Sequence, residues 1–304
     1  MSRSARVISL GWVLPRSQNA ERVAAFYGEV LQLPLLRGYA DAWLFWAGET
    51  VVFEPKSDAG PEWRYPDWKS SPTLPVIRCV ELGSVLSRLR RFNVDVVASG
   101  NDEFGDYAVF QDIDEHFVML RQAPMDSTRP IDIVARERLT MRENHRAYNP
   151  GVAPLPRDIQ GIDSIIRHVA DLGAMAAFYS DTVGLPIVEA APTHVVLDCG
   201  DSTALELRAG GQAESPPQDR FEVPDAFILR VDDFDGFRET LLANKVRIVN
   251  DRIQFGRGVL GYICDPEGHL IGYEERYEQS GCRDNAVAFA EDMEANRRWR
   301  ERSR

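Results

Sequence analysis

Three ionisable residues in the second half of the sequence have the side chains needed for proton transfer. His168, Arg230 and Glu274 each lie within, or at the end of, a run of apolar strand-forming residues. A buried histidine beside a carboxylate suits general acid–base catalysis, and an arginine can hold an enolate or a carboxylate. We therefore predict that these three residues are catalytic, with solvated strand ends as the alternative interpretation.

Two further carboxylates, Glu54 and Glu206, end short strand-like segments of similar sequence. If the two segments are related by symmetry, their side chains could converge on one cavity and bind substrate. The alternative is that they stabilise sheet edges by pairing with Lys56 or Arg208.

Tryptophan is confined to the first half of the chain apart from one residue near the end. Trp12, Trp43 and Trp46 are candidates for an aromatic substrate pocket, and packing in the core is the alternative. His194 opens a strand and is a further candidate for substrate binding, with a surface histidine as the alternative. The aromatic loop of residues 60–68 is predicted to form a lid.

An internal duplication determines which elements must position these residues. Residues 24–36 (AAFYGEVLQLPLL) match residues 176–188 (AAFYSDTVGLPIV), an offset of 152, and later landmarks keep an offset of 151–153. A register held over so many residues is the mark of a repeat. We expect each copy to have the same order of strands and helices.

The elements of the second copy follow from periodicity and turn residues. Asp171 is the expected N-cap of the first helix, with Asn19 or Ser17 as its counterpart in the first copy. Asp265-Pro-Glu-Gly is the expected final turn. The predicted strands are 162–169, 193–197, 203–207, 226–231, 259–264 and 269–274, and a second helix is predicted over 234–244.

The predicted organisation is an N-terminal module at residues 1–122, a linker at 123–158, a C-terminal module at 159–280 and a charged helical tail at 281–304. The linker is rich in Pro, Arg and Asn, and one short helix is predicted around 131–143.

Composition excludes several classes of protein. The net charge of −12 argues against nucleic acid or an anionic membrane as partner. No signal peptide or membrane-spanning run is evident, and the four cysteines form no Cys-x-x-Cys pair. We expect a cytoplasmic monomer or homodimer that binds a small aromatic or oxygenated molecule.

Three motifs give the sequence a family likeness. Gly161–Leu172 (GIDSIIRHVADL), Ala177–Pro186 (AFYSDTVGLP) and Asp265–Ile271 (DPEGHLI) resemble the module signature of the vicinal oxygen chelate superfamily of glyoxalases, extradiol dioxygenases and bleomycin-resistance proteins. The resemblance implies an α+β fold in which two repeated βαβββ modules have curved mixed sheets that enclose a cavity. Many members bind a divalent metal there.

The positions at which the family holds its metal ligands carry poor ligands in this sequence. In the second copy they fall on Ser164, Ala226 and Gly272, and in the first near Leu10 to Trp12, on Pro75 and on Met119. A metal of this type requires imidazole and carboxylate donors. We therefore expect no cofactor, although His168 and Glu274 could belong to a displaced metal site. His168, Arg230 and Glu274 lie two or four residues beyond the lost positions, so strand alternation predicts that they face the same cavity.

Three functions remain open. The first is a metal-independent enzyme of the lyase or isomerase type that acts by acid–base chemistry on an aromatic or oxygenated substrate. The second is a protein that sequesters a small molecule, as in the bleomycin-resistance branch. The third is an extradiol-type ring-cleaving dioxygenase with displaced ligands.

Overall fold

The computed structural model describes residues 5–39, 41–48, 51–57, 63–136, 155–255 and 258–276. Within these ranges, each copy of the repeat contains two successive βαβββ units. The first copy comprises β1 (Val7–Pro15), α1 (Ala20–Phe26), β2 (Leu35–Gly38), β3 (Trp43–Trp46), β4 (Val52–Phe53), β5 (Leu74–Cys79), α2 (Leu82–Arg91), β6 (Val96–Asp102), β7 (Gly105–Gln111) and β8 (Phe117–Gln122). The second comprises β9 (Ile159–Val169), α4 (Leu172–Ala177), β10 (Ile187–Ala190), β11 (His194–Gly200), β12 (Thr203–Ala209), β13 (Asp225–Val231), α5 (Phe234–Ala243), β14 (Arg247–Phe255), β15 (Gly258–Cys264) and β16 (Leu270–Arg276).

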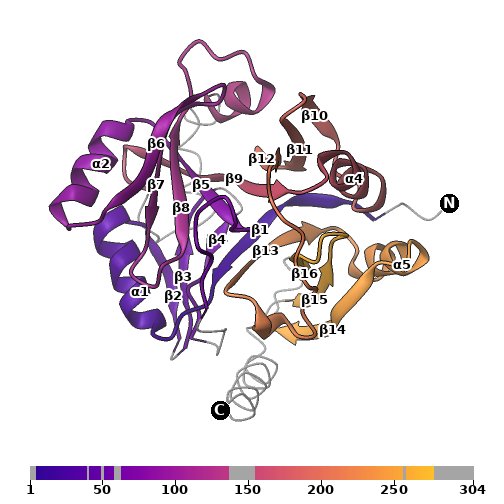
Figure 1. Ribbon diagram of the computed structural model, residues 1–304. Coiled ribbons are helices and arrows are strands. Elements are labelled where there is room, and N and C mark those ends of the chain that lie inside the picture. The colour runs from indigo at the N-terminus through magenta and orange to yellow at the C-terminus, as the bar shows by residue number, and fades with distance from the viewer. Residues whose placement is uncertain are drawn as a thin grey trace.

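The strands form two eight-stranded mixed sheets, and each sheet takes half of its strands from each copy. The first sheet has the order β14-β15-β16-β13-β1-β4-β3-β2, and the second has β10-β11-β12-β9-β5-β8-β7-β6. Antiparallel pairing of β1 with β13 joins the copies in the first sheet, and pairing of β5 with β9 joins them in the second. Figure 1 shows α1 and α2 outside the strands on one side and α4 and α5 on the other.

The predicted helix starts are confirmed in both copies. The side chain of Asn19 accepts a hydrogen bond from the backbone nitrogen of Arg22, and that of Asp171 accepts one from Ala174. These bonds satisfy backbone donors that have no partner inside the helix. Each of the two helices ends in a π-helical turn, Tyr27–Leu31 and Phe178–Thr182.

A buried Tyr–Asp–His group recurs at the final hairpin turn of each copy. Tyr27 donates to Asp112, which also lies 3.3 Å from Nδ1 of His116. Tyr179 and His269 contact Asp265 in the same way. These groups tie the first helix of each copy to its last hairpin, so the histidines of the turns are structural.

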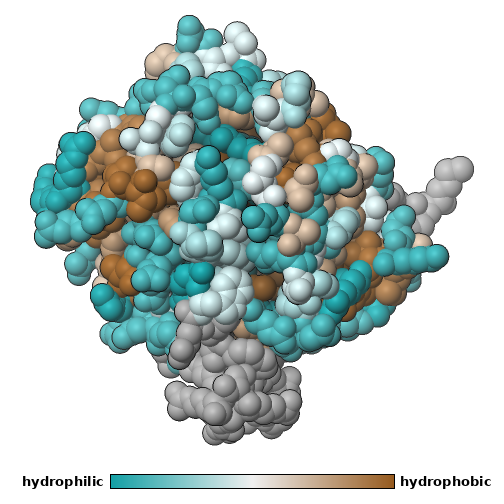
Figure 2. All heavy atoms as spheres, viewed as in Figure 1, coloured by the Kyte–Doolittle hydropathy of each residue, from teal (hydrophilic) through white to brown (hydrophobic). Residues whose placement is uncertain are grey.

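The core lies between the sheets and under the helices. It includes Val23 and Phe26 of α1, Leu89 of α2 and Leu241 of α5, all buried. The outer surface in Figure 2 is mainly hydrophilic, and apolar side chains occur there in separate patches. No helix in the described part of the chain is long and apolar enough to cross a membrane.

The linker begins after β8 ends at Gln122, and β9 begins at Ile159. Residues 130–136 are helical, which agrees with the start of the predicted helix. The rest of that helix, residues 137–143, and the predicted tail at 281–304 lie outside the described residues.

Candidate active site on the first sheet

The two sheets divide the three predicted catalytic residues. Arg230 on β13 and Glu274 on β16 are neighbours in the first sheet, where the two strands pair in parallel. His168 lies on β9 in the second sheet. The prediction that all three share one cavity is therefore wrong, because each sheet combines strands from both copies.

Glu274 is the centre of the group on the first sheet. Its side chain is 1% exposed, and three nitrogens reach its carboxylate. Nε1 of Trp12 lies 2.6 Å from Oε2, while Nε of Arg276 and Nε of Arg230 lie 3.0 Å and 3.4 Å from Oε1. The guanidinium of Arg276 also stacks on the Trp12 ring at 4.6 Å. Donors from three strands therefore fix one carboxylate.

A bulge in β1 places Trp12 in this group. Leu10 pairs with Leu229 and Trp12 pairs with Ile228, so two residues of β1 advance against one of β13. Without the bulge, Leu10 and Trp12 would share a face. Gly11 at the bulge lies under the carboxylate, since a Cβ there would stand 2.8 Å from Oε1 of Glu274. We call the face of the first sheet that carries Trp12, Arg230 and Glu274 the Trp12 face.

The other substrate-binding candidates of the first copy also lie on the first sheet. Trp46 and Trp12 pair with opposite sides of Val52, so Trp46 shares the Trp12 face. Trp43 precedes Trp46 by three residues and alternates to the core face. Glu54 follows Val52 by two residues, and its backbone nitrogen donates to Val13, so its side chain belongs to the Trp12 face.

Glu206 lies on the second sheet, so the predicted convergence of Glu54 and Glu206 is wrong. Glu206 is buried and pairs with the two terminal guanidinium nitrogens of Arg121, with Arg208 at 3.2 Å and with the hydroxyl of Ser164 at 3.0 Å. The predicted pairing with Arg208 is confirmed. Burial opposes ionisation, but Arg121 and Arg208 outweigh it and lower the pKa of Glu206 to about 2.

Equivalent positions in the two sheets explain why their interiors differ. Arg121 occupies in the second sheet the place that Glu274 occupies in the first, an offset of 153, just as Glu206 corresponds to Glu54. The second sheet therefore has one acid and one base that neutralise each other. The first sheet has two acids at these places, and Glu274 is contacted by Arg230, the equivalent of Arg78 in the second sheet, and by Arg276.

Ion pairs and rings bridge the interior of the second sheet. Phe104, fully buried at the β6–β7 turn, is contacted by the guanidinium groups of Arg121, Arg129 and Arg208 at 4.0–5.0 Å. Arg208 pairs with Asp102 at 3.1 Å. These contacts join strands from the two halves of the sheet and favour a structural role for this interior.

His194 is part of the same group of contacts around Phe104 in the interior of the second sheet. It is 5% exposed, and its ring nitrogens lie 3.1 Å from Glu189 and 3.0 Å from Glu103. Its ring meets Phe104 edge-on at 4.9 Å. The prediction that His194 contacts substrate has no support from this placement.

The linker also covers this interior. Asp132, in the helical segment, pairs with Arg78 at 2.7 Å, and Arg78 also pairs with Asp163 of β9. Arg129 pairs with Glu189 at 2.9 Å. The linker is thus part of the packed structure of the second sheet.

His168 lies beneath the aromatic loop. It is 7% exposed, its ring meets Trp68 at 5.4 Å, and its Nδ1 has no hydrogen-bond partner among the described residues. Burial, followed by the charges of Arg208 and Lys69, lowers the pKa of His168 to about 4. In the described part of the predicted lid, residues 63–68, Tyr65 and Trp68 therefore pack on the second sheet, while Arg64 donates to the carbonyl of Arg16 next to β1.

The residues present at the family's ligand positions do not fit a metal. On the Trp12 face, Ala226 and Gly272 offer no donor, and the indole N–H of Trp12 can only donate. The carboxylate of Glu274 already faces two guanidinium groups, which would repel a divalent cation. Within the described ranges, no three His, Cys, Asp or Glu side chains are grouped closely enough to hold a metal ion.

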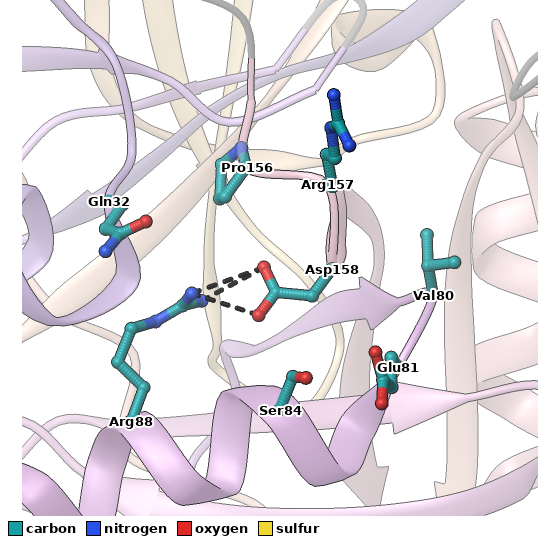
Figure 3. Close-up of a pocket in the computed structure, with 8 residues that line it drawn as sticks. All are labelled: Gln32, Val80, Glu81, Ser84, Arg88, Pro156, Arg157 and Asp158. Atoms are coloured by element: carbon teal, nitrogen blue, oxygen red, sulfur yellow. Dashed lines mark hydrogen bonds and ion pairs between the residues drawn. The ribbon is translucent and has the colours of Figure 1, made fainter.

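A polar hollow of about 390 Å³ lies elsewhere, between α2, the end of the first π-helical turn and the end of the linker. Figure 3 shows Arg88 and Asp158 facing each other across it, and their side chains pair at 2.9 Å. Gln32, Glu81, Ser84 and Arg157 also line it. It lies outside both sheets and contains none of the predicted site residues.

Sequence reasoning missed Arg276 and the partners of Trp12. Arg276 follows Glu274 by two residues, so strand alternation could have placed it on the same face. Arg121 could have been found as the repeat equivalent of Glu274. The bond between Trp12 and Glu274 has no local signal, because the residues are 262 positions apart.

Comparison with known proteins agrees with this geometry. Residues 161–273 match the sequence model of the Glyoxalase/Bleomycin resistance protein/Dioxygenase superfamily. This match covers most of the C-terminal module. The internal duplication gives the N-terminal module the same order of strands and helices, and the paired sheets of the chain have the two-module fold of glyoxalase I. No curated protein matches the chain.

Two solved structures of similar fold cover 90% and 96% of this chain. Glyoxalase I from Zea mays is 15% identical, with a TM-score of 0.56 over 96% of both chains. A protein from Bacillus subtilis, titled "putative dioxygenase", is 14% identical, with a TM-score of 0.61 over 90% of this chain and 86% of its own. At these identities the likeness shows the fold and not the reaction.

Proposed function

We propose that the chain is a metal-independent enzyme of the glyoxalase fold that catalyses proton transfer on a small oxygenated organic molecule. The observation that carries the proposal is the fixed carboxylate of Glu274, with Trp12, Arg230 and Arg276 around it. The match of residues 161–273 to the superfamily model supports a small-molecule substrate, and the unsuitable ligand positions support catalysis without a metal.

Each residue has a distinct part in the proposed reaction. Glu274 accepts a proton from carbon or oxygen when substrate replaces one of its donors, and the 3.4 Å contact to Arg230 is the longest of the three. Arg230 then faces the oxygen on which negative charge develops. Trp12 and Arg276 keep the carboxylate in place and are positioning residues.

Exchange of substrate C–H hydrogens for deuterium tests the proposal directly. It reports proton transfer at carbon even when the complete reaction is unknown. Protein treated with a chelator is incubated in D₂O with 2-oxo acids and 1,3-dicarbonyl compounds, and deuterium uptake at carbon is measured by NMR. We expect catalysed exchange with wild-type protein and its loss in Glu274→Gln. The matched control is Asp251→Asn, which removes a carboxylate paired with Arg238 on the outer surface.

Two results would contradict this proposal. Stoichiometric iron, manganese or zinc in protein purified without a metal-binding tag, with exchange lost on chelation, would establish metal dependence. Exchange that persists in Glu274→Gln would remove this residue from the reaction.

A second candidate is sequestration of a small molecule without turnover. It is favoured by the three donors that already occupy the carboxylate of Glu274. Ligand affinity that is lost in Glu274→Gln, with no exchange or product for any bound compound, would support binding alone.

We further propose a reducing, cytoplasmic location. Cys79, Cys199 and Cys264 are free and buried, and burial raises the pKa of each thiol. Fractionation of cells that express the native gene would test this, and recovery outside the cytoplasm would refute it.

A further inference from the structure

The polar hollow beside α2 is separate from the Trp12 face and shares no residue with it. Its volume of about 390 Å³ lies within the range of small-molecule sites. Apart from Val80 and Pro156, the described residues that line it are polar. This lining suits a small, strongly polar ligand better than an aromatic one.

One ion pair lies at the centre of the hollow in Figure 3. Nη1 of Arg88 lies 2.9 Å from Oδ2 of Asp158, and both terminal nitrogens of Arg88 lie 3.3 Å from Oδ1. The two side chains are only 12% and 13% exposed. Because these charges satisfy each other, neither of them requires a charged ligand.

Two further charges of the hollow are unpaired within the part of the chain that the structure describes. Glu81 is the N-cap residue of α2, but its side chain makes no capping hydrogen bond. Neither its carboxylate nor the guanidinium group of Arg157 has an ion-pair partner among the described residues, and both side chains are exposed. Figure 3 shows Glu81 and Arg157 on different sides of the central ion pair, so they do not neutralise each other. The hollow therefore offers one negative and one positive charge at separate places.

Two neutral polar side chains complete the lining. Ser84 lies on α2 one helical turn before Arg88, and Gln32 follows the first π-helical turn. A hydroxyl group and an amide can each donate and accept hydrogen bonds. They can therefore bind the polar groups of a ligand at either of its ends.

We propose that this hollow binds a small zwitterion of the amino-acid class, with its ammonium group at Glu81 and its carboxylate at Arg157. A simple anion would leave Glu81 unpaired, and a simple cation would leave Arg157 unpaired. A metal ion would be repelled by the two arginines of the lining. The inference goes beyond the proposed function, because no residue around Glu274 takes part in it.

Three probes with one carbon skeleton test the proposal by ligand-observed NMR and calorimetry on the full chain at low salt. They are L-alanine, L-alaninamide, which lacks the carboxylate, and N-acetyl-L-alanine, which lacks the ammonium group. We expect L-alanine to bind about threefold more tightly than either derivative, since ion pairs at exposed side chains are weak. High salt should reduce this preference, because exposed charges are screened.

Two variants should remove the preferences one at a time. Glu81→Gln should make L-alanine and N-acetyl-L-alanine bind alike, whereas Arg157→Gln should make L-alanine and L-alaninamide bind alike. The matched controls are Glu21→Gln on α1 and Arg91→Gln at the end of α2, which remove exposed charges outside the hollow. Both controls should keep the two preferences.

A third variant tests the location of the site. Ser84→Leu places a branched apolar side chain in the hollow and leaves both unpaired charges intact. It should weaken the binding of L-alanine while circular dichroism shows an unchanged fold. Wild-type affinity for L-alanine in this variant would place the ligand elsewhere and overturn the inference.

Three other results would also overturn it. They are the absence of L-alanine binding, equal affinity for the three probes, and preferences that survive in Glu81→Gln and Arg157→Gln. None of these measurements involves deuterium exchange or Glu274. The failure of this inference is therefore distinguishable from the failure of the proposed function.

Discussion

The indole nitrogen of Trp12 donates a 2.6 Å hydrogen bond to Oε2 of Glu274, a residue 262 positions further along the chain. Trp12 belongs to the first copy of the repeat and Glu274 to the second. The candidate site is therefore a product of strand exchange between the copies, since β1 and β16 both flank β13 in one sheet.

Replacing Trp12 with Phe should lower the free energy of unfolding modestly and leave the carboxylate of Glu274 less firmly held. The ring stacking with Arg276 is retained, but a buried carboxylate loses a donor, which costs about 1–2 kcal/mol of unfolding free energy. Urea unfolding followed by circular dichroism measures the change. Trp63→Phe, at a side chain that is 45% exposed, is the control and should stay within about 0.5 kcal/mol of wild type. Equal stability of the two variants would contradict the importance of this bond.

Two glycine-to-alanine changes should have opposite effects. Gly11→Ala places a methyl group 2.8 Å from Oε1 of Glu274, so the carboxylate must move, and we expect a loss of about 1–3 kcal/mol. Gly83 lies in α2 with nothing within 4 Å of an added Cβ, so Gly83→Ala should gain about 0.5–1 kcal/mol from helix propensity. Thermal and urea unfolding report both. A neutral Gly11→Ala would mean that the carboxylate is not held where the structure places it.

Glu206→Gln should be far more damaging than its position outside the candidate site suggests. It leaves Arg121 buried opposite a neutral amide, and breaking a buried pair costs about 3–5 kcal/mol. Asp251→Asn, which breaks an exposed pair, should cost less than about 1 kcal/mol. The free energies of unfolding of the two variants in urea decide the point.

The same glutamate predicts a pH dependence. Its pKa is lowered to about 2 by Arg121 and Arg208 against the effect of burial, so its contribution to stability is present above about pH 4.5. It is lost as pH falls from there towards 2. In Glu206→Gln, the part of the acid transition due to this residue should disappear, and an unchanged acid limb would contradict this assignment.

Asp225 should act in the opposite direction. Burial raises its pKa to about 6, only partly offset by His116 and by a hydrogen bond with Thr73. A raised carboxyl pKa gives stability that is full below about pH 3.8 and is lost as pH rises through about 6. Asp225→Asn should therefore remove roughly 2–3 kcal/mol of this pH-dependent loss between pH 4 and 7. Unfolding curves for both proteins across that range test it, and parallel pH profiles would rule it out.

Much of the fold was predictable because the internal repeat is visible in the sequence. The motif of Ala24 and Ala176 fixed the first helix of each copy, and Asn19 and Asp171 cap those helices as expected. Alternation also predicted that Arg230 and Glu274 share a face. These inferences use only the local periodicity of apolar and polar residues, which can be read from the sequence.

Strand exchange was not predictable, and it explains the errors. Alternation tells which side of a strand a residue faces but not which strand lies beside it, so His168 was grouped with Glu274 although their strands belong to different sheets. The bulge at Gly11, which turns Trp12 towards Glu274, likewise depends on the partner strand. Pairing across more than 200 residues leaves no mark in a single sequence.

The exchange of strands also affects how the protein is made. A ribosome completes β1 more than 200 residues before β13, its neighbour in the first sheet, so neither sheet can close until most of the chain has been synthesised. During that interval the first half carries unpaired strand edges that the second half of another molecule can fill. The protein is therefore expected to form domain-swapped dimers when refolded at high concentration. Two separately produced halves should associate when mixed and form the same two sheets as the intact chain.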